Sequence, residues 1–211
     1  MWSTVTYYAV LIFEAILGVF GIRLYEEPRY DVVNRVADGV EIRRYVPRLA
    51  AEVELPADGK AGRDDAFRLL FAFIAGANQA SGSGNARIAM TTPVEVRDRE
   101  LLAMTAPVQA SVASGRMRMQ FFLPAKYGED SAPKPSDPRV RVVSVPGETI
   151  ATLRFSGSGA DFAQRQSELI GKLAGSAWQP AGAPYSLTYD APFTIPFLRR
   201  NEAAVAVVER R

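Results

Sequence analysis

The sequence predicts an α+β domain in which a mixed or antiparallel sheet, bent like the wall of a barrel, carries two packed helices. Three observations predict this class. Runs of alternating apolar and polar residues are typical of strands, and two longer runs have helical spacing. The order strand, strand, helix, strands also occurs in both halves of the chain, which indicates a pseudo-twofold repeat.

Composition limits the function before any motif is considered. The chain has 211 residues, 48% of them hydrophobic, which suits one globular domain with a sizeable core. Its formal net charge is only +2 and it has no basic run, so a nucleic-acid partner is not expected. There is no cysteine and no histidine, which excludes disulfides, Ser-His-Asp chemistry and Cys/His zinc sites. An enzyme would have to use carboxylates, Lys, Tyr or a bound cofactor.

The chain begins with an apolar segment. Residues 5–22 contain a single charge, Glu14, and a helix of this length just spans a hydrocarbon core of roughly 30 Å. We therefore predict an N-terminal apolar helix in residues 1–24, acting as a membrane anchor, and the folded domain in residues 25–211. Two alternatives stay open, a cleaved signal peptide and an amphipathic helix docked on the domain.

The charges around this segment bear on those alternatives. No Lys or Arg precedes the apolar run and no Ala-x-Ala site follows it, which disfavours a signal peptide. Basic residues follow the run, at Arg23, Arg29 and Arg35. The positive-inside rule then places the domain on the cytoplasmic side, so we expect membrane association through this single segment.

The first half of the domain is predicted as three strands and a helix. Residues 30–36, 40–45 and 49–55 are the strands, separated by an Asp-Gly turn and by Pro47. Residues 57–63 are predicted as a loop. A helix over 64–75 then begins with two acidic residues and has one apolar face, formed by Phe67, Leu70, Phe71 and Ile74.

Two near-identical pentads lie in the middle of the chain. Residues 90–94 read Met-Thr-Thr-Pro-Val and residues 104–108 read Met-Thr-Ala-Pro-Val. They predict a hairpin of strands 88–96 and 101–112, turning at the charged residues 97–100. Because a proline gives no N–H to a strand ladder, each pentad is expected at an edge, a strand end or a bulge, where the sheet bends.

The second half repeats the pattern. A strand over 116–123 and a surface loop over 124–138 precede strands 140–146 and 149–155, which match the second and third strands of the first half. A helix over 160–173 follows, and the closing strands are 185–190 and 203–208. We expect a ligand to sit in the concavity between the helices and the sheet.

Four features together carry a family resemblance. They are Tyr-x-Val-Val at Tyr30, the doubled pentad, Pro-Ser-Asp-Pro at Pro135, and the run from Tyr189 to Glu202. With these, residues 25–211 resemble the SOUL haem-binding protein family. The resemblance implies a twisted β-barrel with two helices, a pseudo-twofold repeat, haem or tetrapyrrole binding, and kinship with ligand-binding modules of some bacterial regulators.

The resemblance also implies how haem would be held. Some members are thought to use an axial histidine, and this chain has none. Others hold haem in an apolar cleft beside the first helix, with basic residues facing the propionates. Here the apolar positions are kept as Phe67 and Phe71, whereas Asp64 and Ala72 stand where Arg or Lys is expected.

The candidate ligand-binding residues have alternative roles. Aromatic and aliphatic side chains of the first helix could line a porphyrin cleft or be core, and Phe193, in a proline-bounded loop, could form its lip. Arg199 and Arg200 could meet propionates or pair with Glu202. The predicted cofactor-binding residues are Phe67, Phe71, Ile74, Leu187, Phe193, Arg199 and Arg200. Sulfur from Met90 or Met104 and tyrosinate from Tyr45, Tyr185 or Tyr189 are alternative iron ligands, or packing residues.

No motif predicts catalysis. The glycine-rich stretches 82–84 and 157–159 lack phosphate-loop patterns, and no Gly-x-Ser-x-Gly elbow is present. The leading prediction is a non-catalytic binder of haem or another tetrapyrrole near a membrane. The alternatives are a binder of other apolar or amphipathic small molecules, a haem-modifying enzyme in which the cofactor supplies the chemistry, and a groove for a partner peptide.

Overall fold

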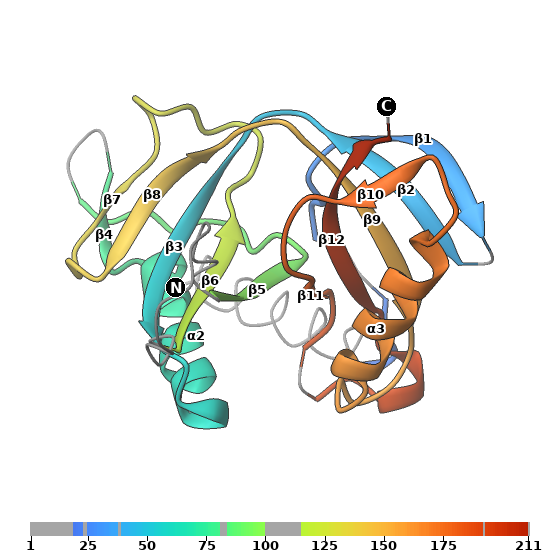
Figure 1. Ribbon diagram of the computed structural model, residues 1–211. Coiled ribbons are helices and arrows are strands. Elements are labelled where there is room, and N and C mark those ends of the chain that lie inside the picture. The colour runs from blue at the N-terminus through green and yellow to red at the C-terminus, as the bar shows by residue number, and fades with distance from the viewer. Residues whose placement is uncertain are drawn as a thin grey trace, which may run out of the picture.

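The computed structural model of the protein describes residues 19–22, 25–37, 39–80, 84–99, 115–191 and 193–210. Figure 1 shows an antiparallel sheet curled into a half-barrel, with one helix, α2 (Gly59–Ala75), on one half and another, α3 (Phe162–Leu173), on the other. The predicted α+β class with two packed helices is therefore confirmed.

Ten strands of the described chain form the curled sheet. Their order is β1-β2-β9-β12-β11-β5-β6-β3-β8, with β10 paired to β12, and every pairing in it is antiparallel. The strands are β1 (Tyr30–Ala37), β2 (Val40–Tyr45), β3 (Arg48–Pro56), β5 (Val94–Arg99), β6 (Arg116–Phe122), β8 (Val140–Val145), β9 (Glu148–Phe155), β10 (Trp178–Pro180), β11 (Tyr185–Thr188) and β12 (Asn201–Glu209). A separate pair, β4 (Asn78–Gln79) and β7 (Lys134–Pro135), and a 3₁₀ turn, η1 (Pro196–Leu198), complete the elements.

Two bent strand pairs join the halves of the sheet. Tyr45 pairs with Glu148 at the end of one ladder, and Arg48 pairs with Val145 at the start of the next. Strands β2 and β3 thus continue into each other alongside β8 and β9, as the long strands at the top of Figure 1 show. The ladder is interrupted where Pro47 faces the Pro146–Gly147 corner, because proline offers no N–H.

Both helices lie on the same face of the sheet. Val96 of β5 packs in the core under α2, and its partner across the ladder is Ser186 of β11. Ser186 Oγ accepts a hydrogen bond from Gln166 Nε2 of α3 at 3.4 Å. Because residues directly opposite in an antiparallel pair point to one side, α2 and α3 share this helix face. Side chains alternate along each strand, so Leu187, which follows Ser186 in β11, points to the opposite, concave face.

Each helix covers a filled core. The first lies between α2 and strands β3, β5, β6 and β8, and includes Val53, Leu70, Phe73, Met119 and Phe121. The second lies between α3 and strands β2, β9 and β12, and includes Ile42, Ala151, Leu169, Leu173 and Val205. These side chains occupy the space between the helices and the sheet, so the prediction of a ligand there is wrong.

The turn of the predicted central hairpin, at residues 97–100, is also wrong. Strand β5 runs to Arg99 and pairs with β6, with Val94 opposite Phe121. Arg97, expected in the turn, is a strand residue, because Glu95 accepts its hydrogen bonds on the concave face. Most of the first pentad precedes β5. The second pentad and the predicted strand 101–112 lie outside the described residues.

Helix α2 begins five residues before the predicted start. The predicted loop 57–63 is therefore wrong from Gly59 onward. Gly62 allows a close approach to β3, since a Cβ there would stand 2.8 Å from the carbonyl oxygen of Pro56. Lys60 and Asp64, one turn apart, form an ion pair of 2.6 Å that supports this first turn. The other predicted strands are confirmed, and β10, the β4–β7 pair and η1 were missed.

The predicted anchor falls largely outside the described chain. Of residues 5–22, only 19–22 are described. Within the described ranges, no helix is both long enough and apolar enough to cross a membrane.

Candidate functional site

A pair of aromatic rings stands on the outer side of α2. Phe67 and Phe71, one turn apart, are stacked with their centroids 6.0 Å apart and their planes 13° from parallel. Phe67 also meets Phe121 of β6 edge-on at 5.3 Å, which fixes it to the core. Phe71 lies at the margin of the buried stripe of α2 and is 49% exposed. This aromatic pair offers a flat apolar surface that is anchored at one end.

A basic side chain adjoins this aromatic pair. Arg68 lies three residues before Phe71, on the neighbouring line of the helix surface, and pairs with Asp65. Its side chain is exposed, so it could exchange Asp65 for an anionic group of a ligand. The family resemblance implies basic residues at positions 64 and 72, and Arg68 was not predicted as a site residue.

Two of the predicted site residues are core. Ile74 is buried in the cluster beneath α2, and Leu187 is buried on the concave face with Tyr45, Tyr185 and Tyr189. Neither side chain reaches a surface that a ligand could contact. The helical or alternating spacing of apolar residues does not show which of them are buried and which are exposed.

Arg200 belongs to a buried ion network. Its Nε donates to Glu202 at 2.9 Å, its Nη1 donates to Glu27 at 3.1 Å, and its guanidinium lies 3.8 Å from the ring centroid of Tyr189. Glu202 is fully buried and also accepts hydrogen bonds from Arg43 at 2.6 Å and from the Tyr189 hydroxyl at 2.7 Å. Arg200 is therefore committed to the protein, and the predicted alternative of pairing with Glu202 is confirmed.

These contacts fix the charge of Glu202. Burial alone would raise the pKa of this carboxyl, but the hydrogen bond and charge of Arg43, with help from Arg200 and Tyr189, lower it below its ordinary value. Glu202 thus stays ionised inside the fold. From the sequence, Glu202 was predicted only as a partner of Arg200, although its place directly before the apolar run 203–208 is unusual for a carboxylate.

The tyrosines on the concave face are buried and neutral in this fold. Burial raises the pKa of Tyr45 to about 12, and it raises those of Tyr185 and Tyr189 well above their ordinary value. All three rings are buried, and the phenols remain neutral at physiological pH. A tyrosinate ligand would need an open path to the phenol oxygen, and all three rings are buried.

A second charged cluster fills the middle of the concave face. Glu148 of β9 accepts hydrogen bonds from Arg48 at 2.7 Å and from Arg97 at 3.3 Å, although β9 and β5 are not neighbours in the sheet. Arg97 also lies 3.8 Å from the ring centroid of Tyr185. These contacts reach across the concave face and explain how so many charges are buried there. None was predicted from the sequence.

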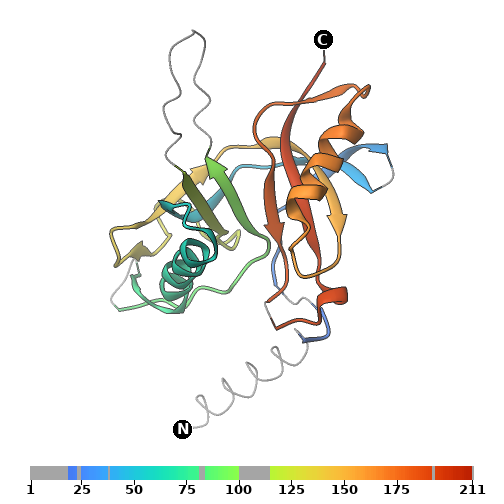
Figure 2. The ribbon, with the colours of Figure 1, turned by 60° about the horizontal axis from the view of Figure 1, so that its bottom comes forward.

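Phe193 and Arg199 lie in the loop between β11 and β12. Phe193 is exposed, as a lip residue would be. Arg199 donates from Nε to the carbonyl oxygen of Thr194 at 2.7 Å, so it holds the loop. The same loop contacts Val19, whose carbonyl accepts the N–H of Ile195 at 3.1 Å. This loop and α2 lie on different parts of the molecule (Figure 2), and the predicted cleft between Phe71 and Phe193 is not formed by the described residues.

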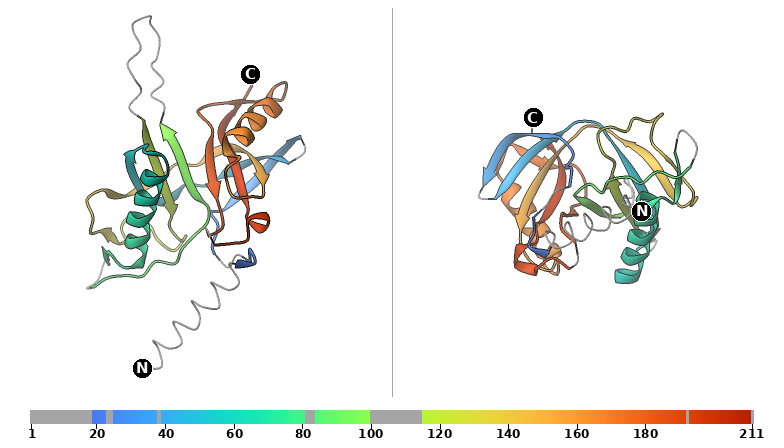
Figure 3. Two further views of the ribbon diagram at one scale, coloured as in Figure 1. Left: turned by 90° about the horizontal axis from the view of Figure 1, so that it is seen from below. Right: turned by 180° about the vertical axis from the view of Figure 1, so that it is seen from behind.

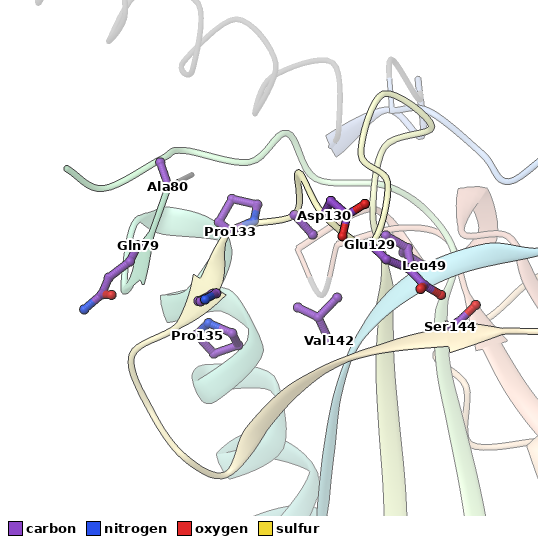
Figure 4. Close-up of a pocket in the computed structure, with 11 residues that line it drawn as sticks. Leu49, Gln79, Ala80, Glu129, Asp130, Pro133, Pro135, Val142 and Ser144 are labelled. Carbon is purple, nitrogen blue, oxygen red and sulfur yellow. The ribbon is translucent and has the colours of Figure 1, made fainter. Parts of the chain in front are cut away.

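A cavity of about 740 Å³ lies beside the β4–β7 pair, at the edge of the sheet. Figure 4 shows the loop from Glu129 to Pro135 on one side and residues of β3 and β8 on the other. The side chains that line it are partly apolar, and Glu129 and Asp130 add carboxylates at the loop. Its size is in the range of small-molecule sites. From the sequence, residues 124–138 were predicted only as a surface loop.

The described residues contain no cluster of three or more carboxylates that could hold a metal ion. The whole sequence lacks histidine and cysteine, so nitrogen and sulfur ligands could come only from other residue types.

Comparison with known proteins gives one family and one fold. The family model described as SOUL heme-binding protein matches residues 25–206. A sequence search of curated proteins found no match.

Three solved structures illustrate the fold. The C-terminal domain of EcmrR has a TM-score of 0.60 at 8% identity, over 86% of this chain and 99% of that one. A hydrolase from Listeria innocua has a TM-score of 0.53 at 12% identity, over 80% and 91%. An uncharacterized conserved protein from the same organism has a TM-score of 0.52 at 10% identity, over 89% and 95%. At such identities, these similarities concern the fold alone.

Proposed function

The chain belongs to the SOUL heme-binding protein family, and from this premise we propose that it binds haem or a similar tetrapyrrole without catalysing a reaction on it. The observation that carries the proposal is the stacked pair Phe67 and Phe71, half open to solvent on α2. A porphyrin is flat and apolar, and an exposed ring anchored on the core favours stacking against it. Arg68 would face a propionate.

The iron should have no imidazole ligand. Haem added to the untagged protein is expected to give a Soret band that saturates at one haem per chain, with the spectrum of five-coordinate or weakly ligated iron. The reason is that the chain has no histidine and its buried tyrosines are neutral. Absorption titration and electron paramagnetic resonance measure this. A bis-imidazole spectrum, or no saturable band, would contradict the proposal.

Removing the exposed ring should weaken haem binding. Phe71→Ala is expected to raise Kd about fivefold or more, corresponding to about 1 kcal/mol for a lost aromatic contact. Phe193→Ala serves as the control, because Phe193 is similarly exposed but lies in the β11–β12 loop. Equal weakening by both variants would instead indicate a cleft that contacts both rings.

The cavity beside β4 and β7 supports a second candidate, binding of a non-planar amphipathic molecule. Its carboxylates favour a cation. Rhodamine 6G is a suitable probe, followed by fluorescence anisotropy. Ser144→Trp should fill the cavity from the exposed edge of β8 and abolish rhodamine binding, while Phe71→Ala should leave it unchanged. Rhodamine binding that Phe71→Ala abolishes would place the ligand on α2 instead.

We also propose that the half-barrel arose by duplication of one unit. The strand order supports this, because β2-β9-β12-β11 leads to the centre of the sheet from one side and β8-β3-β6-β5 leads to it from the other. Along the chain, β2 and β3 precede α2, and β8 and β9 precede α3, so each strand–strand pair contributes one strand to each series.

Attachment to a membrane through residues 5–22, with the domain on the cytoplasmic side, is the last part of the proposal. Deleting residues 1–18 should release a folded, soluble domain that keeps Val19 and its bond to the β11–β12 loop. Circular dichroism and size-exclusion chromatography should then match those of the full chain in detergent. An unfolded or aggregated product would mean that the apolar segment packs against the domain.

A further inference from the structure

Five large apolar side chains gather at one end of the molecule. They come from two segments far apart in sequence, residues 19–22 and residues 193–198. We call the set the apolar tip, and its members and their exposed fractions are Phe20 (58%), Ile22 (49%), Phe193 (58%), Phe197 (72%) and Leu198 (37%). Large exposed apolar groups at one place mark an interaction surface more often than scattered single residues do.

The two segments are in direct contact. The N–H of Ile195 donates to the carbonyl oxygen of Val19 at 3.1 Å. Gly21 has a φ of 70° and lies so close to Leu198 that a Cβ on it would stand 3.0 Å from the Leu198 oxygen. In Figures 2 and 3, the short red turn η1 lies beside the blue start of the described chain. The tip is therefore one surface.

The loop of the tip is held in shape by its own hydrogen bonds. The N–H of Leu198 donates to Ile195 at 2.9 Å, and the N–H of Arg199 donates to Pro196 at 3.2 Å. Thr194 is buried and accepts the bond from Arg199 Nε. The loop thus keeps Phe197 in solvent although burying it would be favourable.

We propose that the apolar tip is a membrane-contact surface that enters the interfacial layer of a lipid bilayer. The inference rests on the proposed attachment of residues 5–22 to a membrane. That apolar run ends inside the tip, at Phe20 and Ile22, so a bilayer that takes up the run lies directly against the β11–β12 loop. Phenylalanine and leucine are typical of surfaces that lie in this layer.

The absence of cysteine makes the test direct. Single cysteines replace Phe193 or Phe197 in the tip, and Phe71 or Val208 elsewhere, in the full chain. The two control residues are 49% and 48% exposed, so labelling should be equally tolerated. Each variant is spin-labelled and reconstituted into vesicles of phosphatidylcholine and phosphatidylglycerol. Collisions with oxygen and with a water-soluble nickel chelate then report the depth of each label.

In vesicles, labels at 193 and 197 are expected to collide more with oxygen than with nickel, while labels at 71 and 208 collide freely with nickel. The protein could bind vesicles while the labels at 193 and 197 collide with nickel as freely as the label at 208. That result would contradict the proposed membrane contact of the apolar tip but not the attachment through residues 5–22. Labels shielded from both reagents would mean that protein covers the tip, which also overturns it. Protein that does not float with vesicles would overturn the attachment and the tip together, whereas the haem titration would be unaffected.

Discussion

Replacing Glu202 with alanine should lower the free energy of unfolding by about 3 kcal/mol. The side chain of Arg43 is only 4% exposed, and it would lose the buried carboxylate that accepts its hydrogen bonds at 2.6 and 3.1 Å. Removing one partner of a buried ion pair typically costs about 3–5 kcal/mol. We expect the low end because Glu41 still binds Arg43 and Glu27 still binds Arg200. Urea denaturation measures the change.

The control is Glu41→Ala, which removes the more exposed carboxylate from the same guanidinium. It should cost about 1 kcal/mol or less, because Glu41 is partly exposed and Arg43 keeps its buried carboxylate partner Glu202. Equal losses of unfolding free energy in the two variants would show that the burial of Glu202 does not determine its contribution to stability.

The effect of Glu202 should also depend on pH in a defined direction. Its pKa is lower in the folded protein than in the unfolded chain, so its contribution is complete above the ordinary carboxyl pKa and is lost as pH falls through the folded value. The stability difference between wild type and Glu202→Gln should therefore shrink below about pH 4.3.

Replacing Phe73 with alanine should cost about 3–5 kcal/mol, because the ring is 1% exposed in the core beneath α2 and its removal leaves a cavity. Phe71→Ala, two residues away, should cost about 1 kcal/mol or less, because that ring is half exposed and mainly loses its stack on Phe67. Thermal and urea melts compare the two. Similar losses would mean that Phe71 is core and that no open aromatic surface exists on α2.

The sequence predicted the elements better than their environment. Strands such as β2 and β3 follow from alternation, which is local and survives folding. Arg97 was assigned to a turn because four charged residues in a row resemble a solvent-exposed link. Its partner Glu148 lies 51 residues away, so the contact that makes a charged strand residue stable is not visible in the local pattern.

The candidate site shows the same limit. Phe67, Phe71 and Ile74 lie close together on α2, yet only Phe71 is exposed. The buried stripe of α2 contains its neighbours Leu70, Phe73 and Ile74, and Phe71 lies at the margin of that stripe. Glu202 and Arg43 are separated by 159 residues, and no spacing rule pairs them. The cavity beside β4 and β7 depends on a loop whose path is set by tertiary contacts.

The bent strand pairs β2–β3 and β8–β9 also set an order of events during synthesis. Strand β2 can pair with β1 early, but its other neighbour, β9, is some 110 residues further on, as the pairing of Val40 with Leu153 shows. At translation rates of about 5–20 residues per second, β2 waits roughly 5–20 s for that partner on the ribosome. Strand β3 similarly waits for β8. The strands of each half of the chain therefore need pairing partners from the other half. The domain should fold only after its synthesis is nearly complete.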